Sequence, residues 1–164
     1  MQVAVVAFTA IALPAAAHTG PHRPPVMKPL PAAKTNAAAV TPVATVNAFH
    51  TALASGNPRS ALDLLAENVL IFESGGVEHS RAEYSSHHLA ADAAYSAAVR
   101  RTLINRSHGE AGNAAWVTSV ETVAGAYRGR VINSRSVETM LLHKTAGQWR
   151  ITHIHWSSKD VAPK

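Results

Sequence analysis

A change in hydrophobic period near Val99 constrains the fold of this 164-residue chain more than any other feature. Before it, apolar residues recur at helical spacing. After it, apolar and polar residues alternate, as is typical of antiparallel strands joined by hairpins. The alternating segments lie near 99–107, 114–123, 130–143 and 148–157, separated by short glycine-containing stretches at Gly109/Gly112, Gly125 and Gly147. Helices followed by a run of strands predict an α+β domain, in which a curved antiparallel sheet covers its apolar face with those helices.

Three helices are expected before this change. Thr41-Pro42 and Asn57-Pro58 each combine an N-cap residue with proline at the first helical position. A short strand over 69–73 should follow the second helix. Ser80-Arg81-Ala82-Glu83 matches the capping box, in which serine and glutamate satisfy backbone amides at a helix start. A third, long helix is therefore expected over 81–98.

The first 40 residues are expected to lie outside the folded domain. An apolar run over 3–13 precedes Pro14 and Ala15-Ala16-Ala17, the small-residue pattern of a signal peptidase site. The alternative is a buried N-terminal helix. We predict a secreted or periplasmic bacterial protein with no membrane span left after processing. Its expected parts are a signal peptide over 1–17 cleaved near Ala17, a Pro/Ala-rich tether over 18–40, a domain over 41–158 and a tail over 159–164.

Composition narrows the possible chemistry. The chain has no cysteine, which excludes disulfides, thiolate metal sites and cysteine nucleophiles. The net charge of +5 comes from basic residues that are spread along the chain. Nucleic-acid binding is not expected, because it requires a concentrated basic face.

The last alternating segment holds two histidines beside two tryptophans. His153 and His155 share one face of an extended strand, so they would project together. They could bind one metal ion, with His88 as a third ligand from the facing helix, and zinc or copper suits such nitrogen ligands. Alternatively, they hydrogen-bond within a pocket or lie at an interface. Alternation leaves open which face of this strand points inward.

Two further segments could line a pocket. Tyr84, His88, Ala91 and Tyr95 fall on one helical face, which would either contact a ligand or pack in the core. Glu73 begins a Gly-Gly turn that also carries Glu78 and His79. This turn offers a general base or a metal carboxylate, or is an ordinary solvated turn.

The order of elements, ending in GQWRITHIHWSS, resembles the nuclear transport factor 2-like superfamily and its SnoaL-like branch. The segments over 43–65 and 69–72 and the final strand carry this resemblance. The final strand is also similar to the closing strand of the calcium/calmodulin-dependent kinase association domain. The resemblance implies a cone-shaped α+β barrel with a pocket between the sheet and the long helix, often in a homodimer formed through the outer sheet face. It implies no single activity, because members include ketosteroid isomerase-like enzymes, polyketide cyclases, dehydratases, and binding or assembly domains.

We expect a domain that binds a small organic ligand, with zinc or copper as the candidate cofactor. The ligand-binding residues would be His88, Trp116, Glu138, His153 and Trp156, and the metal ligands His88, His153 and His155. The first alternative is a ketosteroid isomerase-like or polyketide cyclase-like enzyme. In it, Glu73 or His155 takes a proton next to a carbonyl while Tyr84 hydrogen-bonds the enolate. No motif singles out one carboxylate for this role. The second alternative is a dimeric assembly domain.

Overall fold

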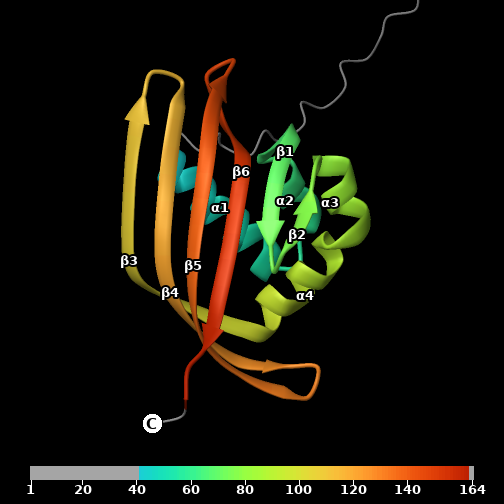
Figure 1. Ribbon diagram of the computed structural model, residues 1–164. Coiled ribbons are helices and arrows are strands. Elements are labelled where there is room, and N and C mark those ends of the chain that lie inside the picture. Colours follow the sequence, from blue (N-terminus) through green and yellow to red (C-terminus); the bar gives the residue numbers. More distant parts are fainter. Residues whose placement is uncertain (1–40, 163–164) are drawn as a thin grey trace, which may run out of the picture. The chain divides into compact units, whose positions relative to one another are not determined.

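The computed structural model describes residues 41–162, which form four helices and one six-stranded sheet (Figure 1). The expected signal peptide and tether lie outside the described residues. The helices are α1 (Pro42–Ala54), α2 (Pro58–Leu62), α3 (Arg81–His87) and α4 (Leu89–Ala98). The strands are β1 (Leu65–Glu73), β2 (Gly76–Glu78), β3 (Val99–Ala111), β4 (Ala114–Tyr127), β5 (Arg130–Thr145) and β6 (Gln148–Asp160).

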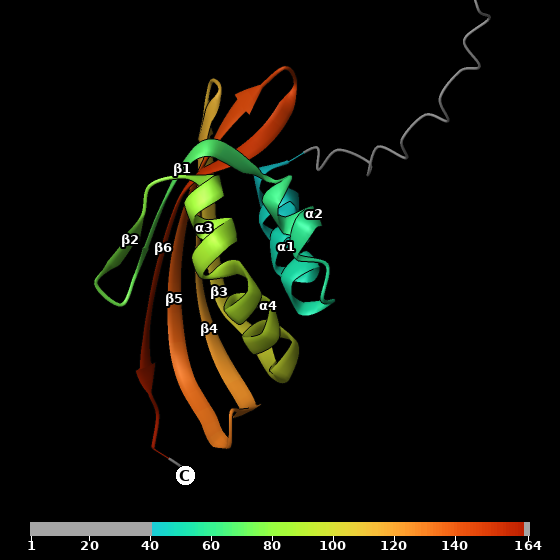
Figure 2. The ribbon, with the colours of Figure 1, turned by 90° about the vertical axis from the view of Figure 1, so that its right-hand side faces the viewer.

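The sheet is curved and unclosed, with the strand order β2-β1-β6-β5-β4-β3. Figure 1 shows the four long strands side by side and the short β1 and β2 beyond β6, and Figure 2 shows the helices gathered on one side of the sheet. The α+β prediction is confirmed, and so are the four alternating strands. One detail differs, because β1 pairs with β6 in parallel and the sheet is therefore mixed. No helix among residues 41–162 is long and apolar enough to cross a membrane.

The predicted helix caps are present in the structure. The Thr41 hydroxyl accepts a hydrogen bond from Ala44 N at 3.1 Å, and Ser80 Oγ accepts one from Glu83 N at 3.1 Å. The Glu83 carboxylate accepts from the backbone N–H of His79 at 2.7 Å, one residue before the position that the motif predicts. Such caps satisfy amides that have no partner inside the helix, and each contributes roughly 1 kcal/mol.

The expected long helix is broken at His88. The α3 helix ends at His87 and α4 begins at Leu89, while His88 has φ −105° and ψ −28°. In an unbroken helix His88 would follow Tyr84 on the buried face. The break moves the buried position one residue on, so Leu89 enters the core and His88 stays exposed. Burying the apolar side chain of Leu89 instead of the imidazole of His88 is favourable, because it removes more apolar surface from water.

The inner face of the sheet, which packs against the helices, changes from apolar to polar along the strands. Two cross-strand rows are mainly apolar: Ala115–Leu142–Ile151–Leu65 and Val117–Met140–Ile154–Ile71. They form the core with Val46, Phe49 and Leu53 of α1 and with Tyr84 of α3. The next row, Ser119–Glu138–Trp156–Glu73, carries two carboxylates. The apolar rows hold the fold together, and the following row begins a polar interior.

Two irregularities decide which side chains point inward. In β6 the register with β5 shifts, so that Leu142 pairs with Ile151 and Leu141 with His153. Ile151 and Ile154 are both fully buried although they are three positions apart, because the extra residue reverses the alternation. A second shift, in β3 between Leu103 and Asn105, lies between two inward-facing arginines, Arg101 and Arg106.

Two glycines that mark turns in the sequence lie inside strands instead. A Cβ added to Gly109 of β3 would lie 2.1 Å from the ring of Trp116, which covers it from β4. A Cβ on Gly125 of β4 would lie 2.6 Å from the carbonyl oxygen of Ala98. Both positions therefore need glycine for close approach and not for a turn.

Candidate functional site

Two cavities on the inner side of the sheet share Glu73 and Ser74 in their lining. The first has a volume of about 390 Å³ and lies between the β1–β2 hairpin and α3. The second has a volume of about 330 Å³ and lies between α4 and the polar rows of the sheet. Besides the shared pair, the first is lined by Ile71, Gly76, Val77, Glu78, Tyr84 and His88, and the second includes Asp92, Tyr95, Arg101, Tyr127 and Trp156. These volumes suit a small organic ligand.

Two carboxyl groups with raised pKa values face the second cavity. Burial raises the pKa of Asp92, although the hydrogen bond from Tyr84 and the nearby His88 oppose the rise. Partial burial also raises the pKa of Glu73, and the charge of Asp92 adds to this effect. The negative charge of Asp92 thus disfavours ionisation of Glu73, and neighbouring carboxyl groups with shifted pKa values are common in acid–base active sites.

Tyr84 links the first cavity to Asp92. Its side chain is only 1% exposed, and its hydroxyl donates a hydrogen bond to Asp92 Oδ2 at 2.9 Å. Burial and the neighbouring Asp92 raise the pKa of Tyr84, so it remains a donor at ordinary pH. Tyr84 therefore holds one oxygen of Asp92 in place, and no hydrogen bond from within residues 41–162 occupies the other.

The rim of the first cavity carries a buried carboxylate beside two histidines. Glu78 is 5% exposed, and its Oε1 contacts His88 Nδ1. This hydrogen bond raises the pKa of His88, with burial acting in the opposite direction. His87 Nδ1 lies 3.7 Å from the other oxygen, Glu78 Oε2.

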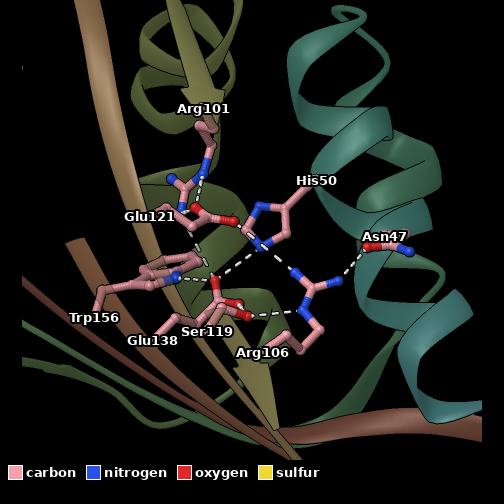
Figure 3. Close-up of polar contacts among 8 residues, drawn as sticks. All are labelled: Asn47, His50, Arg101, Arg106, Ser119, Glu121, Glu138 and Trp156. Carbon is pink, nitrogen blue, oxygen red and sulfur yellow. Dashed lines mark hydrogen bonds and ion pairs between the residues drawn. The ribbon is translucent and has the colours of Figure 1, made fainter. Parts of the chain in front are cut away.

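A second group of ionisable residues lies deeper, between α1 and the sheet. We call Glu121, Glu138, His50, Arg101 and Arg106 the paired cluster, because its charges face opposite charges (Figure 3). Glu138 Oε2 accepts a hydrogen bond from Trp156 Nε1 at 2.7 Å and lies 2.8 Å from His50 Nε2. Burial alone would raise the pKa of Glu138, but His50, Trp156 and Arg101 outweigh it and hold that pKa below its usual range.

The arginines complete this cluster. Arg101 donates from Nε to Glu121 Oε2 at 2.7 Å, and its Nη2 lies 2.6 Å from the same oxygen. Arg106 donates to Ser119 Oγ at 3.1 Å and to Asn47 Oδ1 of α1 at 2.6 Å. Two guanidinium groups thus offset two buried carboxylates and connect the helix to the sheet.

The structure places only part of the sequence-predicted site in the cavities. Glu73, Tyr84, His88 and Trp156 line them, and Glu138 lies within the paired cluster. Trp116 lies on the opposite, outer face of the sheet, over Gly109.

The histidines of β6 also lie on the outer face, which corrects the expectation that they line the pocket. His153 and His155 pack around Phe72, with ring centroids 5.0 Å and 6.3 Å from it. Because Phe72 alternates with the cavity residues Ile71 and Glu73, its side chain points to the other side of the sheet. His88 lies in the first cavity, so it does not converge with His153 and His155 on one metal ion. The extra residue in β6 is the physical cause.

Several residues of the site were not singled out from the sequence. Asp92 carries the only charged side chain in α4, an otherwise alanine-rich helix, and this isolation is the signal that could have marked it. His50 lies in α1, and no nearby residue marks it as the partner of Glu138, which lies far along the chain in β5. Arg101 could not have been placed beside Glu121, because their pairing depends on the register of β3 with β4.

Comparisons with known proteins agree with this architecture. The model of the SnoaL-like domain family matches residues 43–160. A candidate ketosteroid isomerase from Shewanella frigidimarina NCIMB 400 is 42% identical, with 69% of this chain and 91% of that chain covered and a TM-score of 0.67. No curated protein matches the chain.

Two further solved structures share the fold at lower identity. A candidate calcium/calmodulin-dependent protein kinase II association domain from Xanthomonas campestris is 21% identical, with 73% of this chain and 86% of that chain covered and a TM-score of 0.63. The CaMKII hub of S. rosetta is also 21% identical, with 79% of this chain and 100% of that chain covered and a TM-score of 0.63.

Proposed function

Because the chain belongs to the SnoaL-like domain family, we propose that its two neighbouring cavities bind a small carbonyl compound, from which Glu73 removes a proton. The observation that carries this proposal is that Glu73 lines both cavities and shares the second one with Asp92. Export of the protein, with removal of residues 1–17, remains a separate proposal that mass spectrometry of the mature N-terminus would test.

Glu73 is the base in this proposal. Its carboxylate is accessible to a ligand in either cavity, and its raised pKa brings it closer to the pH at which proton transfer is efficient. A proton on the carbon next to the carbonyl moves to Glu73. The electrons of the broken C–H bond move to the carbonyl oxygen, which becomes an enolate oxygen. Return of the proton to a different carbon gives an isomer.

Asp92 is the acid that stabilises the enolate. Its raised pKa favours the protonated form, whose O–H can donate to the carbonyl oxygen as negative charge develops there. Tyr84 occupies the other oxygen of Asp92 and acts through it as a positioning residue. In this proposal Asp92, and not Tyr84 as the sequence suggested, donates the hydrogen bond to the enolate oxygen. His155 lies on the outer face of the sheet and takes no part in the proton transfer.

The similarity to the Shewanella frigidimarina protein supports the reaction class, since that relative is described as a candidate ketosteroid isomerase. Isomerisation of a β,γ-unsaturated ketone is the simplest reaction that needs one base and one neutral acid in a partly apolar site. The residues lining the cavities include both kinds of group.

Hydrogen exchange tests the proposal with any enolisable ketone that enters the cavities, so the natural substrate need not be identified first. The protein is incubated in deuterium oxide with a set of such ketones, including a β,γ-unsaturated ketosteroid, and deuterium uptake is followed by mass spectrometry. The Glu73→Gln variant should lose about 10²–10⁴-fold in rate while still binding the ketone by ligand-observed NMR. Loss of the acid in Asp92→Asn should lower the rate by about 10²-fold or more.

His155→Ala is the matched control, because its side chain lies on the opposite face of the sheet, and its rate should equal that of the natural protein. Undiminished exchange in Glu73→Gln would refute the assignment of the base. Ketone binding with no exchange in the natural protein would instead identify a binding domain without turnover.

The outer sheet face favours a second function, which is assembly. Phe72, Trp116, Val137 and Leu141 are large apolar residues that are each 37–46% exposed. Trp116 and Leu141 are direct cross-strand neighbours. Exposed apolar patches of this kind commonly mark protein interfaces. We propose that this face joins two copies of the chain in a homodimer.

Light scattering after size-exclusion chromatography would measure the molecular mass of this assembly. Leu141→Asp should give monomers, because it places a charge among the exposed apolar residues of this face. Val131→Asp is a suitable control, since Val131 is also exposed but lies near the β4–β5 turn. A monomeric natural protein would rule out the homodimer.

A further inference from the structure

We infer that Glu78, Glu83 and His87 bind one divalent cation of the zinc type at the rim of the first cavity. This site is separate from the proposed proton transfer and uses none of the residues assigned to it. It also differs from the histidine set that the sequence suggested, because two of those histidines lie on the outer face.

The three residues come from two elements that face each other. Glu83 and His87 are four residues apart on α3, so their side chains lie on the same face of that helix. Glu78 is the last residue of β2, beside the start of α3. One ligand atom from each residue lies within 4.8 Å of the other two, close enough for a single ion to contact all three after small side-chain rotations.

Glu78 provides an independent reason to expect a ligand. It is 5% exposed, and one of its oxygens is occupied by His88. Within residues 41–162, its other oxygen, Oε2, has no hydrogen-bond partner and lies 3.7 Å from His87 Nδ1. A buried carboxylate oxygen without a donor is costly, and a bound cation would remove that cost.

The surroundings of the three ligands are also suitable. His88 holds Glu78 by the oxygen that the ion would not use, as partners of metal-binding carboxylates commonly do. The backbone N–H of His79 donates to Glu83 Oε2 at 2.7 Å and leaves Glu83 Oε1 available. The side chain of His87 is 59% exposed, so an ion can enter from solvent.

The ligand types point to zinc. One imidazole nitrogen and two carboxylates form a mixed set, whereas magnesium and calcium prefer sites built from oxygen alone. Three protein ligands leave a fourth position of a tetrahedral zinc ion open to water or to an anionic ligand. The site would thus place a positive charge at the entrance of the first cavity.

Calorimetric titration of the metal-free full chain with zinc tests this inference. We expect one zinc ion per chain at this site. The affinity should fall at least about tenfold in His87→Ala, Glu83→Gln and Glu78→Gln, since each removes one ligand. His79→Ala and His153→Ala are matched controls, because neither side chain belongs to the group, and their affinities should be unchanged.

His87→Ala is the decisive variant, because an exposed side chain can be removed without disturbing the core. Circular dichroism would confirm that it folds. Cobalt(II) provides a second readout, since the visible absorption of a four-coordinate site should weaken in this variant. Equal zinc affinity in His87→Ala and the natural protein would overturn the inference, as would a natural protein that binds no zinc. Deuterium exchange by zinc-free protein tests the proton transfer separately.

Discussion

Glu138 and Glu73 lie in the same cross-strand row of the sheet, yet their pKa values move in opposite directions. Glu138 is the more buried of the two, with 3% exposure, and its pKa is lowered. Glu73 reaches the open cavities, and its pKa is raised. Burial raises the pKa of both groups, so the difference comes from their neighbours. At Glu138 the contacts with His50, Trp156 and Arg101 outweigh burial, whereas at Glu73 the charge of Asp92 adds to it.

The two regions accordingly have different roles. In the paired cluster each carboxylate is neutralised, and its contacts connect α1 to the sheet. Glu73 and Asp92 both line the second cavity with raised pKa values, which makes the pair suited to acid–base chemistry. The same residue type thus stabilises the fold in one region and remains reactive in the other.

The largest expected effect comes from removing the central carboxylate of the paired cluster. Glu138→Ala leaves His50 and the Trp156 N–H without their acceptor and removes a carboxylate 3.9 Å from Arg101, so it should lower the free energy of unfolding by about 3–5 kcal/mol. Urea unfolding followed by circular dichroism measures this change. Glu67→Ala is the control, because Glu67 is exposed and its pairing with Arg81 contributes little. A loss below about 1 kcal/mol would contradict a stabilising role for the cluster.

A smaller loss is expected when Glu138 keeps its charge but loses one donor. Trp156→Phe retains an aromatic ring to stack on Phe49 and removes the 2.7 Å hydrogen bond from the indole N–H. Hydrogen bonds to charged groups typically contribute about 1.5–3 kcal/mol, so the free energy of unfolding should fall by about 2 kcal/mol. The same urea experiment applies. No loss in this variant would show that His50 and Arg101 alone satisfy Glu138.

The corresponding change near the cavities should have a weaker effect on stability and a clearer one on protonation. Tyr84→Phe removes the hydrogen bond to Asp92 and should lower the free energy of unfolding by about 1 kcal/mol. Because that bond lowers the pKa of Asp92, its loss should raise this pKa further. NMR titration of the side-chain carboxyl carbon would measure the shift. An unchanged pKa would mean that the bond has no influence on Asp92.

The smallest effects, and the most direct comparison, come from the pH dependence of two isosteric variants. Because the pKa of Glu138 is lower in the folded state, this group stabilises the fold at pH values above its unfolded-state pKa of about 4.3. The stabilisation is lost as the pH falls through the folded-state pKa. Glu138→Gln should therefore be less stable than the natural protein at neutral pH, and the difference should shrink in acid.

Glu73→Gln should change the stability at neutral pH in the opposite direction. The raised pKa of Glu73 means that ionisation disfavours the folded state as the pH rises above about 4.3 and through the folded-state value. Its replacement should slightly stabilise the protein at neutral pH, and this gain should vanish in acid. Urea unfolding curves at several pH values from about 3 to about 7, a range that includes the usual carboxyl pKa values, measure the stability of both variants. The comparison would be contradicted if both variants were stabilised, or both destabilised, at neutral pH.

Sequence reasoning was most successful where a feature is local. The caps at Thr41 and Ser80 follow from residues within four positions, and the structure forms both. It was less successful where packing overrides local preference. The predicted helix over 81–98 breaks at His88, because the break lets Leu89 pack in the core while His88 stays exposed.

The candidate site follows the same division. Glu73, Tyr84 and His88 were expected at a pocket, and they line the first cavity. Glu73 is placed by its turn and Tyr84 by its helical face, whereas His88 reaches the cavity at the helix break. The pairing of Tyr84 with Asp92 was not expected. It joins residues on either side of the helix break, whose mutual position depends on how α3 and α4 pack on the sheet.

The amino-acid sequence by itself determined the helices, the four long strands and the membership of an α+β class, because hydrophobic period and capping are properties of neighbouring residues. Only the tertiary structure decided which side chains face the interior. One extra residue in β6 turns His153 and His155 outward, and another irregularity lies between the inward-facing Arg101 and Arg106 of β3. A bulge exchanges the two faces of a strand without changing its composition, so the choice depends on pairing with distant strands and on which face the helices can bury.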